Sequence, residues 1–356
     1  MASSPAFHPL PVARVDRLCA DAVAITFDVP EGLAETFAFR PGQYLTLRQL
    51  ADGVEQRRSY SICAPRGAPP RIGVRRVPGG LFSDRLVDAL RPGDVLDVLP
   101  PLGNFTPAAL ETPAHHGLVA AGSGITPVLS IVATVLASSA DARVTLLYGN
   151  RRADTVMFAE ELADLKDAYP ARLQLVHVLS REPRDVELFS GRLDASRLRA
   201  MFDTVIPASD VDEWWLCGPY GMVRDAQLVL QDRGVPKDRV HRELFYVDEP
   251  PPAPRRPEDS VVDGRTTEVT VVLDGRKTTM TVPAGVPILD AAQRVRADLP
   301  FACKGGVCGT CRARLRDGEV RMRRNYALEP DELAAGFVLT CQSLPTTDHV
   351  TVDYDS

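Results

Sequence analysis

Hydrophobic and polar residues alternate in three different ways along the chain, and each pattern predicts its own kind of domain. From Pro11 to about Thr106, short runs rich in Val, Ile, Leu, Tyr and Thr are separated by turns such as Arg40-Pro41-Gly42. Short strands at this spacing are typical of an antiparallel β-barrel or sandwich. We therefore predict an antiparallel barrel domain over residues 1–108.

The pattern changes at about Glu111, where apolar runs are followed by stretches with helical periodicity. Three such pairs precede Tyr246: HGLVAAG with TPVLSIVATVLAS, RVTLLYG with VMFAEELADLKDAY, and EWWLCG with YGMVRDAQLVLQDRG. The uncharged stretch from Gly117 to Ala140 has the length of a membrane span, but Gly, Ser, Thr and Pro interrupt it, so we interpret it as strand, turn and helix. Strands alternating with helices predict a doubly wound, parallel α/β domain over residues 109–246.

A proline-rich segment, VDEPPPAPRRPEDSVV, covers residues 247–262. Proline lacks the backbone donor and restricts the residue before it, so we predict a stiff linker here. The last domain, residues 263–356, opens with two β-rich runs around Asp274-Gly275, which is a hairpin signal. PILDAAQRVRADL then has the pattern of a helix. This indicates a small α+β domain.

Composition limits the functions of these domains. The 356 residues exceed one ordinary hydrophobic core, and 45% hydrophobic with 25% charged residues is ordinary globular usage. The 41 Lys and Arg against 47 Asp and Glu give a net charge of −6, so no broad basic field attracts nucleic acid or anionic lipid. The first residues show no secretory signal pattern. We expect a cytoplasmic protein that binds neither nucleic acid nor a membrane.

Four of the seven cysteines are grouped near the C-terminal end with the spacing C-x4-C-x2-C-x29-C: Cys303, Cys308, Cys311 and Cys341. This is the plant-type spacing for thiolates that bind a 2Fe-2S cluster. The glycines of CKGGVCGTC allow a tight loop whose backbone N–H groups point at the sulfurs. A four-thiolate zinc site is the alternative, but it favours paired C-x2-C spacings. We predict four cluster ligands in a domain that resembles a plant-type ferredoxin, of the β-grasp class.

Arginines crowd the segment after this loop: Arg312, Arg314, Arg316, Arg321, Arg323 and Arg324. A solvated strand face explains them. A docking patch that steers an acidic electron-transfer partner explains them equally well. The sequence leaves both interpretations open.

Two short motifs in the barrel region supply what a flavin needs. Arg58-Ser59-Tyr60-Ser61 stands at the end of a strand, and Gly80-Leu81-Phe82-Ser83 follows about twenty residues later. The FAD diphosphate requires a guanidinium and free backbone N–H groups, and the flavin ring requires an aromatic face and a small donor. We predict that these residues bind FAD; an exposed strand end is the alternative for the first motif alone.

Two further motifs follow apolar strands of the α/β domain. The turn Gly122-Ser123-Gly124-Ile125-Thr126-Pro127 opens a helix, and its glycines permit close approach of a pyrophosphate. Cys217-Gly218-Pro219 ends another strand, at the edge where a parallel sheet holds its ligand. Each alone could be a tight strand-to-helix connection. Together they predict a dinucleotide site.

The order of these motifs resembles that of the ferredoxin–NADP reductase superfamily over nearly the whole chain. The resemblance implies roles for seven residues: FAD binding for Arg58, Tyr60, Ser61 and Ser83, proximity to the flavin ring for Thr126, and contact with the nicotinamide for Cys217 and Glu243. We therefore expect Ser61, Cys217 and Glu243 to be the catalytic residues.

The choice of nucleotide follows from charge. An acidic residue after the second strand would favour NAD, whereas arginines there favour the additional phosphate of NADP. The chain has Arg151 and Arg152 at one place and Ser180-Arg181 at the other. Ordinary surface arginines are the alternative. We predict NADPH as the electron donor.

The predicted order of carriers is NADPH, FAD, 2Fe-2S cluster and an external oxygenase, because a flavin can accept a hydride and release single electrons. YGNRR, CKGGVCGTC and NYALEPDELAAGFVLTCQ are most similar to reductases that serve di-iron oxygenase subunits acting on an aromatic CoA thioester in phenylacetate breakdown. Reductases of Rieske-type ketosteroid hydroxylases are the second resemblance. A zinc-bound, non-enzymatic adaptor is the alternative from another class.

Overall fold

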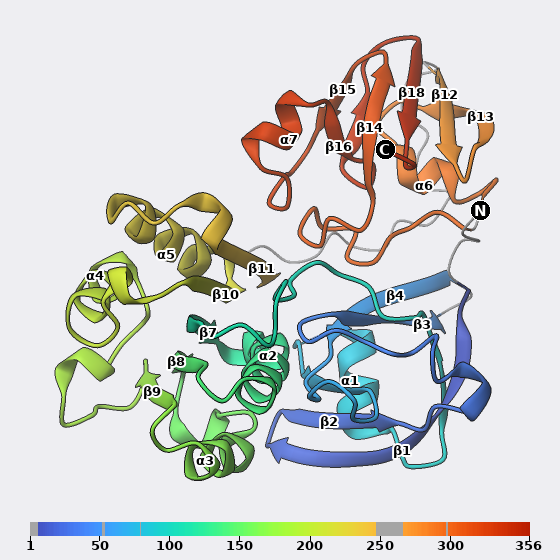
Figure 1. Cartoon of the computed structure of the whole chain (residues 1–356). Coiled ribbons are helices and arrows are strands. Elements are labelled where there is room, and N and C mark those ends of the chain that lie inside the picture. The colour runs from blue at the N-terminus through green and yellow to red at the C-terminus, as the bar shows by residue number, and fades with distance from the viewer. Residues whose placement is uncertain (1–5, 52–53, 79, 247–265, 297) are drawn as a thin grey trace. The chain divides into compact units, whose positions relative to one another are not determined.

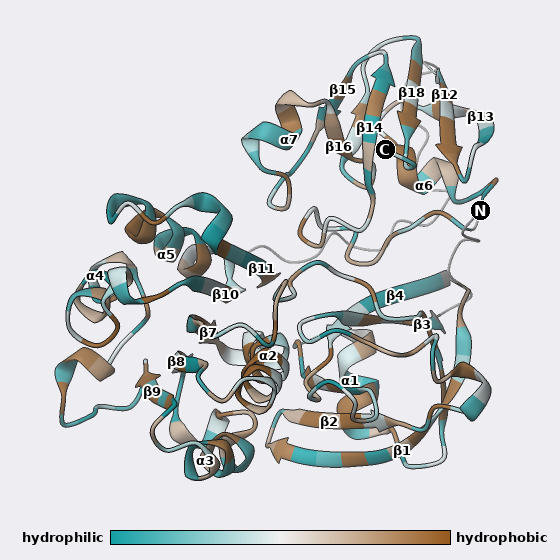
Figure 2. Cartoon of the chain, viewed as in Figure 1, coloured by the Kyte–Doolittle hydropathy of each residue, from teal (hydrophilic) through white to brown (hydrophobic). Residues whose placement is uncertain are grey.

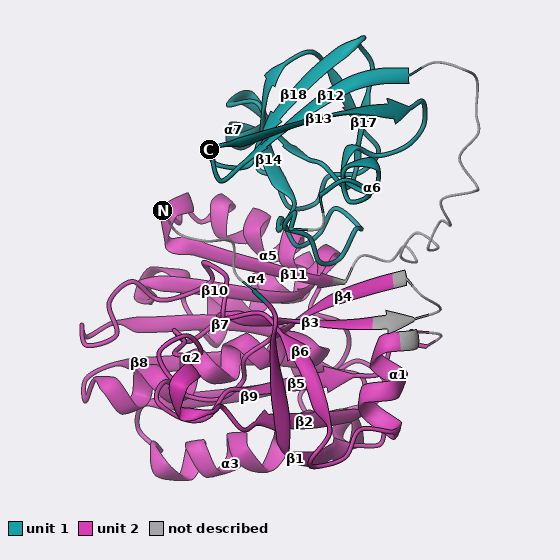
Figure 3. Cartoon of the chain, turned by 90° about the vertical axis from the view of Figure 1, so that its right-hand side faces the viewer, with its two compact units in different colours: residues 1–6, 248–356 teal, residues 7–247 magenta. Residues whose placement is uncertain are grey.

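The computed structural model describes residues 6–51, 54–78, 80–246, 266–296 and 298–356. The chain divides into two compact units (Figure 3). The larger unit is Phe7–Val247, and the smaller unit is Asp248–Ser356 together with Met1–Ala6. The predicted linker, residues 247–262, lies outside the described residues.

The first half of the larger unit is the predicted antiparallel barrel. Its six strands lie in the order β4-β3-β6-β1-β2-β5, and a bridge between Ile62 and Ile72 joins the two outer strands. Helix α1 (Leu81–Asp88) packs on β5 and β2. The strands are β1 (His8–Cys19), β2 (Ala22–Phe27), β3 (Tyr44–Ala51), β4 (Val54–Ser61), β5 (Arg71–Arg75) and β6 (Val95–Val98). Alternate residues of these strands, such as Val23 and Ile25, form one buried core.

The second half is the predicted parallel α/β sheet, with the strand order β11-β10-β7-β8-β9 (Figure 1). The order reverses between β7 and β10. The strands are β7 (His115–Ala121), β8 (Arg143–Asn150), β9 (Leu173–Leu179), β10 (Glu213–Pro219) and β11 (Val240–Tyr246). The helices are α2 (Ile125–Ser138), α3 (Ala159–Ala168), α4 (Ala195–Thr204) and α5 (Tyr220–Asp232).

The uncharged stretch at Gly117–Ala140 forms strand β7, a short turn and helix α2, as predicted. Figure 2 shows α2 coloured mainly as hydrophobic, and most of its side chains are buried in the core. Among the described residues, no helix has both the length and the apolar character needed to cross a membrane.

The barrel and the α/β sheet contact each other closely inside the larger unit. The Ser130 hydroxyl on α2 donates to the Ala64 carbonyl at 2.6 Å, and the Arg66 N–H donates to the Thr134 hydroxyl at 3.0 Å. At Gly42 of the barrel, an added Cβ would lie 3.2 Å from the Ile131 Cδ1 of α2. The two lobes therefore hold a fixed arrangement at their boundary.

The smaller unit has a mixed five-stranded sheet with the order β13-β12-β18-β14-β16, in which only β12 and β18 are parallel. The predicted hairpin turn is confirmed, since Asp274 and Gly275 both have positive φ, 52° and 70°. The elements are β12 (Thr266–Leu273), β13 (Arg276–Pro283), α6 (Ile288–Ala292), β14 (Arg312–Asp317), β15 (Val320–Met322), α7 (Pro330–Ala334), β16 (Phe337–Leu339), β17 (Ser343–Pro345) and β18 (His349–Asp353).

Helix α6 is shorter than its sequence pattern predicts. The pattern extends to Leu299, but the helix ends at Ala292. The reason is Arg296, which is buried and donates to the carbonyls of Leu273 and Arg276 at 2.9 and 3.0 Å. These bonds hold the chain in a turn where the periodicity alone favours a further helical turn.

Candidate functional site

The two predicted flavin motifs lie together on the barrel. The rings of Tyr60 and Phe82 are 6.2 Å apart, although they come from β4 and α1. The Ser83 hydroxyl accepts from the Val77 N–H at 3.0 Å and donates to the Gly80 carbonyl at 3.2 Å, which closes the turn into the helix. Helix α1 begins at Leu81 with Gly80 as its N-cap, so no side chain covers its first N–H groups. Such groups bind an anionic diphosphate.

In the Arg58–Ser61 motif, some side chains contact the neighbouring strand and others are partly exposed. The Ser59 hydroxyl lies 3.0 Å from that of Thr46, and the Arg58 guanidinium donates to the Arg57 carbonyl at 2.7 Å while staying partly exposed. Burial raises the pKa of Tyr60, with a smaller opposing effect from Arg58. The Tyr60 hydroxyl therefore stays protonated and can donate a hydrogen bond.

The three predicted catalytic residues meet at one place. The Ser61 hydroxyl on the barrel donates to the Glu243 carboxylate on β11 at 3.1 Å. Glu243 stands in register with Cys217 on β10. Burial raises the pKa of Glu243 to about 7, and the hydrogen bond from Ser61 partly opposes this. Burial also raises the pKa of the Cys217 thiol, and the nearby carboxylate adds to that effect.

The glycine turn of the α/β lobe packs against the end of β10. Gly122–Gly124 forms a single 3-10 turn, and a Cβ on Gly124 would lie only 2.3 Å from the Cys217 carbonyl oxygen. A Cβ on Gly218 would lie 3.2 Å from the Ala121 nitrogen. This contact lies at the reversal of strand order, which is where open α/β sheets bind their ligands.

The first turn of α2 packs against the barrel. Thr126 and Pro127 are buried, and the Thr126 hydroxyl donates to the Ser123 carbonyl at 3.0 Å. A Cβ on Gly73 of β5 would lie 2.5 Å from the Thr126 methyl group. Thr126 therefore lies at the boundary between the two lobes, next to the barrel strand.

The loops after β8 and β9 place two of the predicted arginines side by side. The Ser180 N–H donates to the Asn150 carbonyl at 2.9 Å, and the Arg181 N–H donates to the Arg151 carbonyl at 2.8 Å. The side chains of Arg151 and Arg181 are exposed. Arg152 instead lies 3.2 Å from Asp154 in an exposed ion pair. Arg151 and Arg181 are thus the better placed pair for a phosphate.

The four predicted cysteines form two pairs. The hydrogen bond from the Cys308 thiol, together with backbone N–H groups, lowers the pKa of Cys303; the N–H groups of Gly305 and Cys308 lie 3.3 and 3.4 Å from its sulfur. The Cys311 thiol likewise lowers the pKa of Cys341. The four sulfurs therefore face one another as Cys303 with Cys308 and Cys311 with Cys341.

The two pairs match the ligands that a 2Fe-2S cluster needs. Such a cluster is held by four thiolates, two on each iron. The interactions of Cys308 with Cys311 and of Cys303 with Cys341 show that the two pairs lie close to each other.

Three known domain families match consecutive segments of the chain, in the same order as the predicted FAD, nucleotide and cluster sites. Residues 9–106 match the oxidoreductase FAD-binding domain, 118–228 the oxidoreductase NAD-binding domain, and 271–346 the 2Fe-2S iron-sulfur cluster binding domain. One subunit of the 1,2-phenylacetyl-CoA epoxidase of Escherichia coli (strain K12) is 45% identical, with 98% of each chain covered. The chain belongs to the ferredoxin–NADP reductase superfamily, in the group with a C-terminal ferredoxin domain.

Two further proteins show how far the likeness extends. The ferredoxin reductase component of 3-ketosteroid-9-alpha-monooxygenase from Rhodococcus rhodochrous is 35% identical, covering 97% of this chain and 96% of its own. The structure of phthalate dioxygenase reductase superposes with a TM-score of 0.63 and covers 98% of both chains at 24% identity, which supports the fold. The chain is thus an NAD(P)H-dependent electron-transfer reductase with FAD, nicotinamide nucleotide and 2Fe-2S domains.

The residues of this reductase fit the groups its family binds. When bound, the flavin accepts one hydride, with its two electrons, and releases the electrons singly. The Ser61 hydroxyl and the Glu243 carboxyl share a hydrogen bond, and a carboxyl whose pKa is about 7 can hold or release a proton at neutral pH.

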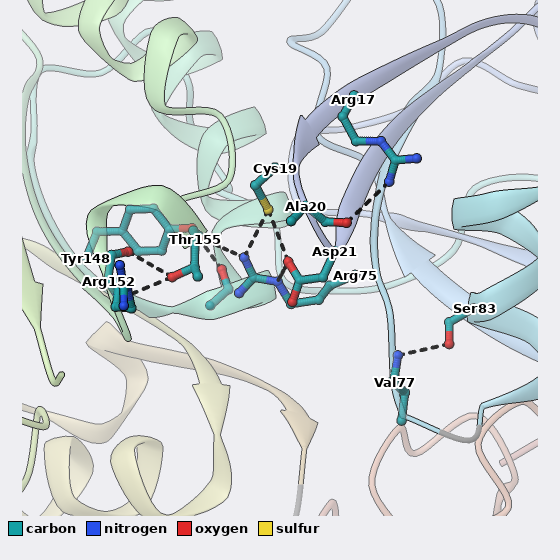
Figure 4. A network of polar contacts seen from close by, with 11 residues as sticks. Arg17, Cys19, Ala20, Asp21, Arg75, Val77, Ser83, Tyr148, Arg152 and Thr155 are labelled. Carbon is teal, nitrogen blue, oxygen red and sulfur yellow. Dashed lines mark hydrogen bonds and ion pairs between the residues drawn. The ribbon is translucent and has the colours of Figure 1, made fainter.

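Arg75 is a residue of the larger unit that the sequence analysis did not select. Figure 4 shows its guanidinium between the lobes, where it donates to the Thr155 carbonyl and lies 3.4 Å from Asp21 and 3.7 Å from the Cys19 sulfur. A Cβ on Gly122 would lie 3.4 Å from Arg75, so this cation stands beside the glycine turn. The available signal was the Arg75-Arg76 pair at the strand end, just before the second flavin motif.

The arginines after the ligand loop are partly neutralised. Arg312 pairs with Glu332 at 2.5 Å, and Arg316 pairs with Asp353 at 2.8 Å. Arg314 stands opposite Asp353 in register. These contacts favour a solvated strand face for β14. Arg323 differs, since its guanidinium donates to the Cys341 carbonyl at 3.3 Å, next to a predicted ligand.

Proposed function

We propose that this reductase passes electrons from NADPH through FAD and its 2Fe-2S cluster to the di-iron oxygenase that epoxidises phenylacetyl-CoA in phenylacetate catabolism. The 45% identity to the matching chain of the E. coli epoxidase, over nearly the full length of both proteins, supports this acceptor. The ketosteroid monooxygenase reductase has the same domains but 35% identity, so a Rieske-type hydroxylase is the second candidate.

One observation carries the electron-transfer part of the proposal. The larger unit brings Ser61, Cys217 and Glu243 together, and the smaller unit brings four thiols together in two pairs. A two-electron site and a one-electron centre in a single chain are what a reductase needs between a hydride donor and an oxygenase. A zinc-bound adaptor would need neither the group of Ser61, Cys217 and Glu243 nor the two cysteine pairs.

The residue assignments come from the family resemblance together with this geometry. In this proposal Ser61, Cys217 and Glu243 face the reacting rings, Thr126 lies near the flavin, and Arg151 and Arg181 bind the additional phosphate of NADPH. The FAD diphosphate lies between Arg58 and the start of α1 at Gly80–Ser83. The metal ligands are Cys303, Cys308, Cys311 and Cys341. The domains are 1–108, 109–246 and 263–356, joined by residues 247–262.

Reconstitution tests the acceptor. Purified reductase is mixed with the phenylacetyl-CoA oxygenase subunits, NADPH and phenylacetyl-CoA, and the epoxide is quantified. We expect product with the parent chain and none with Cys308→Ser, which retains the hydride site. A matched assay with a Rieske-type ketosteroid hydroxylase and its steroid should give much slower turnover. Faster turnover in the second assay would replace the proposed acceptor with the alternative.

A truncated chain ending at Asp248 tests the domain division. The hydrophobic cores of the barrel and the α/β lobe contain no residue of the smaller unit, so the larger unit should fold alone. We expect it to reduce ferricyanide with NADPH near the parent rate and to lose most cytochrome c reduction. Equal cytochrome c reduction by both proteins would contradict the proposed order of carriers.

A further inference from the structure

The residue after the fourth predicted ligand is a buried amide that contacts two parts of the cysteine site. Gln342 is 2% exposed. Its side-chain nitrogen donates to the Lys304 carbonyl at 2.7 Å and lies 3.5 Å from the Cys341 sulfur, within hydrogen-bond reach of a thiolate. An amide nitrogen has two protons, so one group can serve both acceptors.

The backbone of Gln342 is also fixed. Its N–H donates to the Leu339 carbonyl at 2.8 Å, and its carbonyl accepts from the Arg323 N–H at 2.9 Å. These bonds anchor the residue in the turn between β16 and β17. The side chain therefore starts from a fixed point when it reaches the loop that carries the other cysteines.

The ligand loop passes tightly over the Gln342 side chain. Gly306 has a φ of 79°, and a Cβ there would lie 3.2 Å from the Gln342 Cγ. The Gly306 carbonyl accepts from the N–H groups of Tyr326 and Ala327 at 3.0 and 3.2 Å. The loop is therefore held by hydrogen bonds at two points. The Gln342 side chain donates to Lys304, and the backbone of residues 326–327 donates to Gly306.

We propose that Gln342 is a positioning residue that raises the reduction potential of the cluster and ties the Cys303–Cys308 loop to the Cys341 ligand. The proposal rests on the assignment of the four cysteines in the proposed function. Reduction adds negative charge, part of which lies on the thiolate sulfurs. A donor aimed at one of those sulfurs stabilises the reduced form more than the oxidised form.

The chemistry of the amide distinguishes this role from simple filling of space. Methionine has a similar length but no donor. Glutamate has nearly the same shape, lacks the donor when ionised, and adds negative charge beside the sulfur. Ser343 provides a matched control, because it is adjacent and fully buried, yet its hydroxyl donates to the Leu339 carbonyl and not to a sulfur.

The test uses the full chain carrying FAD and the cluster. The midpoint potential of the cluster is measured by redox titration followed by electron paramagnetic resonance, and iron loss to a chelator is followed over time. We expect Gln342→Met to lower the equilibrium constant for cluster reduction about tenfold, which is about 59 mV for one electron. Gln342→Glu should lower it further. Both should lose iron faster than Ser343→Ala, whose potential should match the parent's.

A Gln342→Met potential equal to the parent's would overturn the inference, and so would an equal shift in Ser343→Ala. Should neither Gln342 variant retain its cluster, the parent labelled with ¹⁵N in glutamine side chains decides. Coupling of that nitrogen to the spin of the reduced cluster supports the contact, and its absence overturns it. A parent without two irons per chain would instead overturn the proposed function.

Discussion

The hydride site and the cysteine site are assembled over very different distances along the sequence. Ser61 and Glu243, which share a hydrogen bond, are 182 residues apart and meet only because the barrel packs against the α/β sheet. The cysteine site is more local, since one loop carries three of the four thiols and a single later strand end supplies the last. The hydride site therefore depends on the packing of two lobes, and the cysteine site depends on one loop and the hydrogen bonds that hold it.

The largest effect should come from breaking the local site. Replacing Cys308 by Ser removes one of four thiolates, so we expect loss of the cluster and a fall in cytochrome c reduction of about 100-fold or more. FAD content and ferricyanide reduction with NADPH should remain, because every residue proposed to bind FAD or the nucleotide lies in the other unit. Iron and flavin analysis of the purified variant provides the check. Parallel loss of flavin would show that the two sites are not independent.

The next effect comes from breaking the assembled site. Glu243→Gln removes the ionisable group, and we expect hydride transfer to slow about 100-fold, within the usual range for a proton-handling residue. Because the pKa of Glu243 is about 7, the parent rate should change through neutral pH, and this change should vanish in the variant. Stopped-flow measurement of flavin reduction against pH provides the test.

Ser61→Ala serves as the partner variant, since it removes the hydrogen bond that lowers the pKa of Glu243. The pH at which the rate changes should move upward. An unchanged pH profile in both variants would mean that these residues do not handle a proton, although iron content should stay at the parent value in either case.

A smaller effect is expected at the proposed phosphate site, in the loops after β8 and β9. The double substitution Arg151→Ala and Arg181→Ala should raise the KM for NADPH about tenfold to a hundredfold, since a charged hydrogen bond contributes roughly 1.5–3 kcal/mol. The KM for NADH should change little. Arg152→Ala is the matched control, because its guanidinium is already paired with Asp154. Equal effects on both nucleotides would remove the phosphate assignment.

The smallest effect concerns stability of the larger unit. The folded protein holds the Glu243 proton more tightly than the unfolded chain, whose carboxyl has a pKa near 4.5. The stabilising contribution is present below about pH 4.5 and is lost as the pH rises through about 7. Glu243→Gln should therefore raise the Tm at pH 8.5 by a few degrees, about 2–4 °C for each kcal/mol, and by less at pH 5.5. Calorimetry at both pH values measures it, and equal shifts would contradict the burial of this carboxylate.

Features of the two regions that have a local sequence signal could be predicted, whereas features that depend on the packing of distant segments could not. The cysteine spacing and the glycine turns are local signals, so the ferredoxin domain and the strand–turn–helix at Gly117–Ala140 could be predicted directly. The contact between Ser61 and Glu243 could be expected only through a family resemblance, because no local pattern connects two strands of different lobes. Arg75 and Gln342 were not selected, since their roles depend on which backbone groups pack beside them. The early end of α6 at Ala292 had the same cause, the burial of Arg296.

The close approach of Gly124 to the Cys217 carbonyl changes how mutational scans of this reductase should be interpreted. At Gly124 even alanine would place a carbon 2.3 Å from a backbone oxygen, so a saturation library should tolerate no other residue there. Gly221 is the second residue of α5, and a Cβ there would meet no atom within 4 Å, so this position should accept many residues. Intolerance at position 124 would thus follow from the packing of the two turns alone, and such a library could not by itself identify Gly124 as a ligand contact.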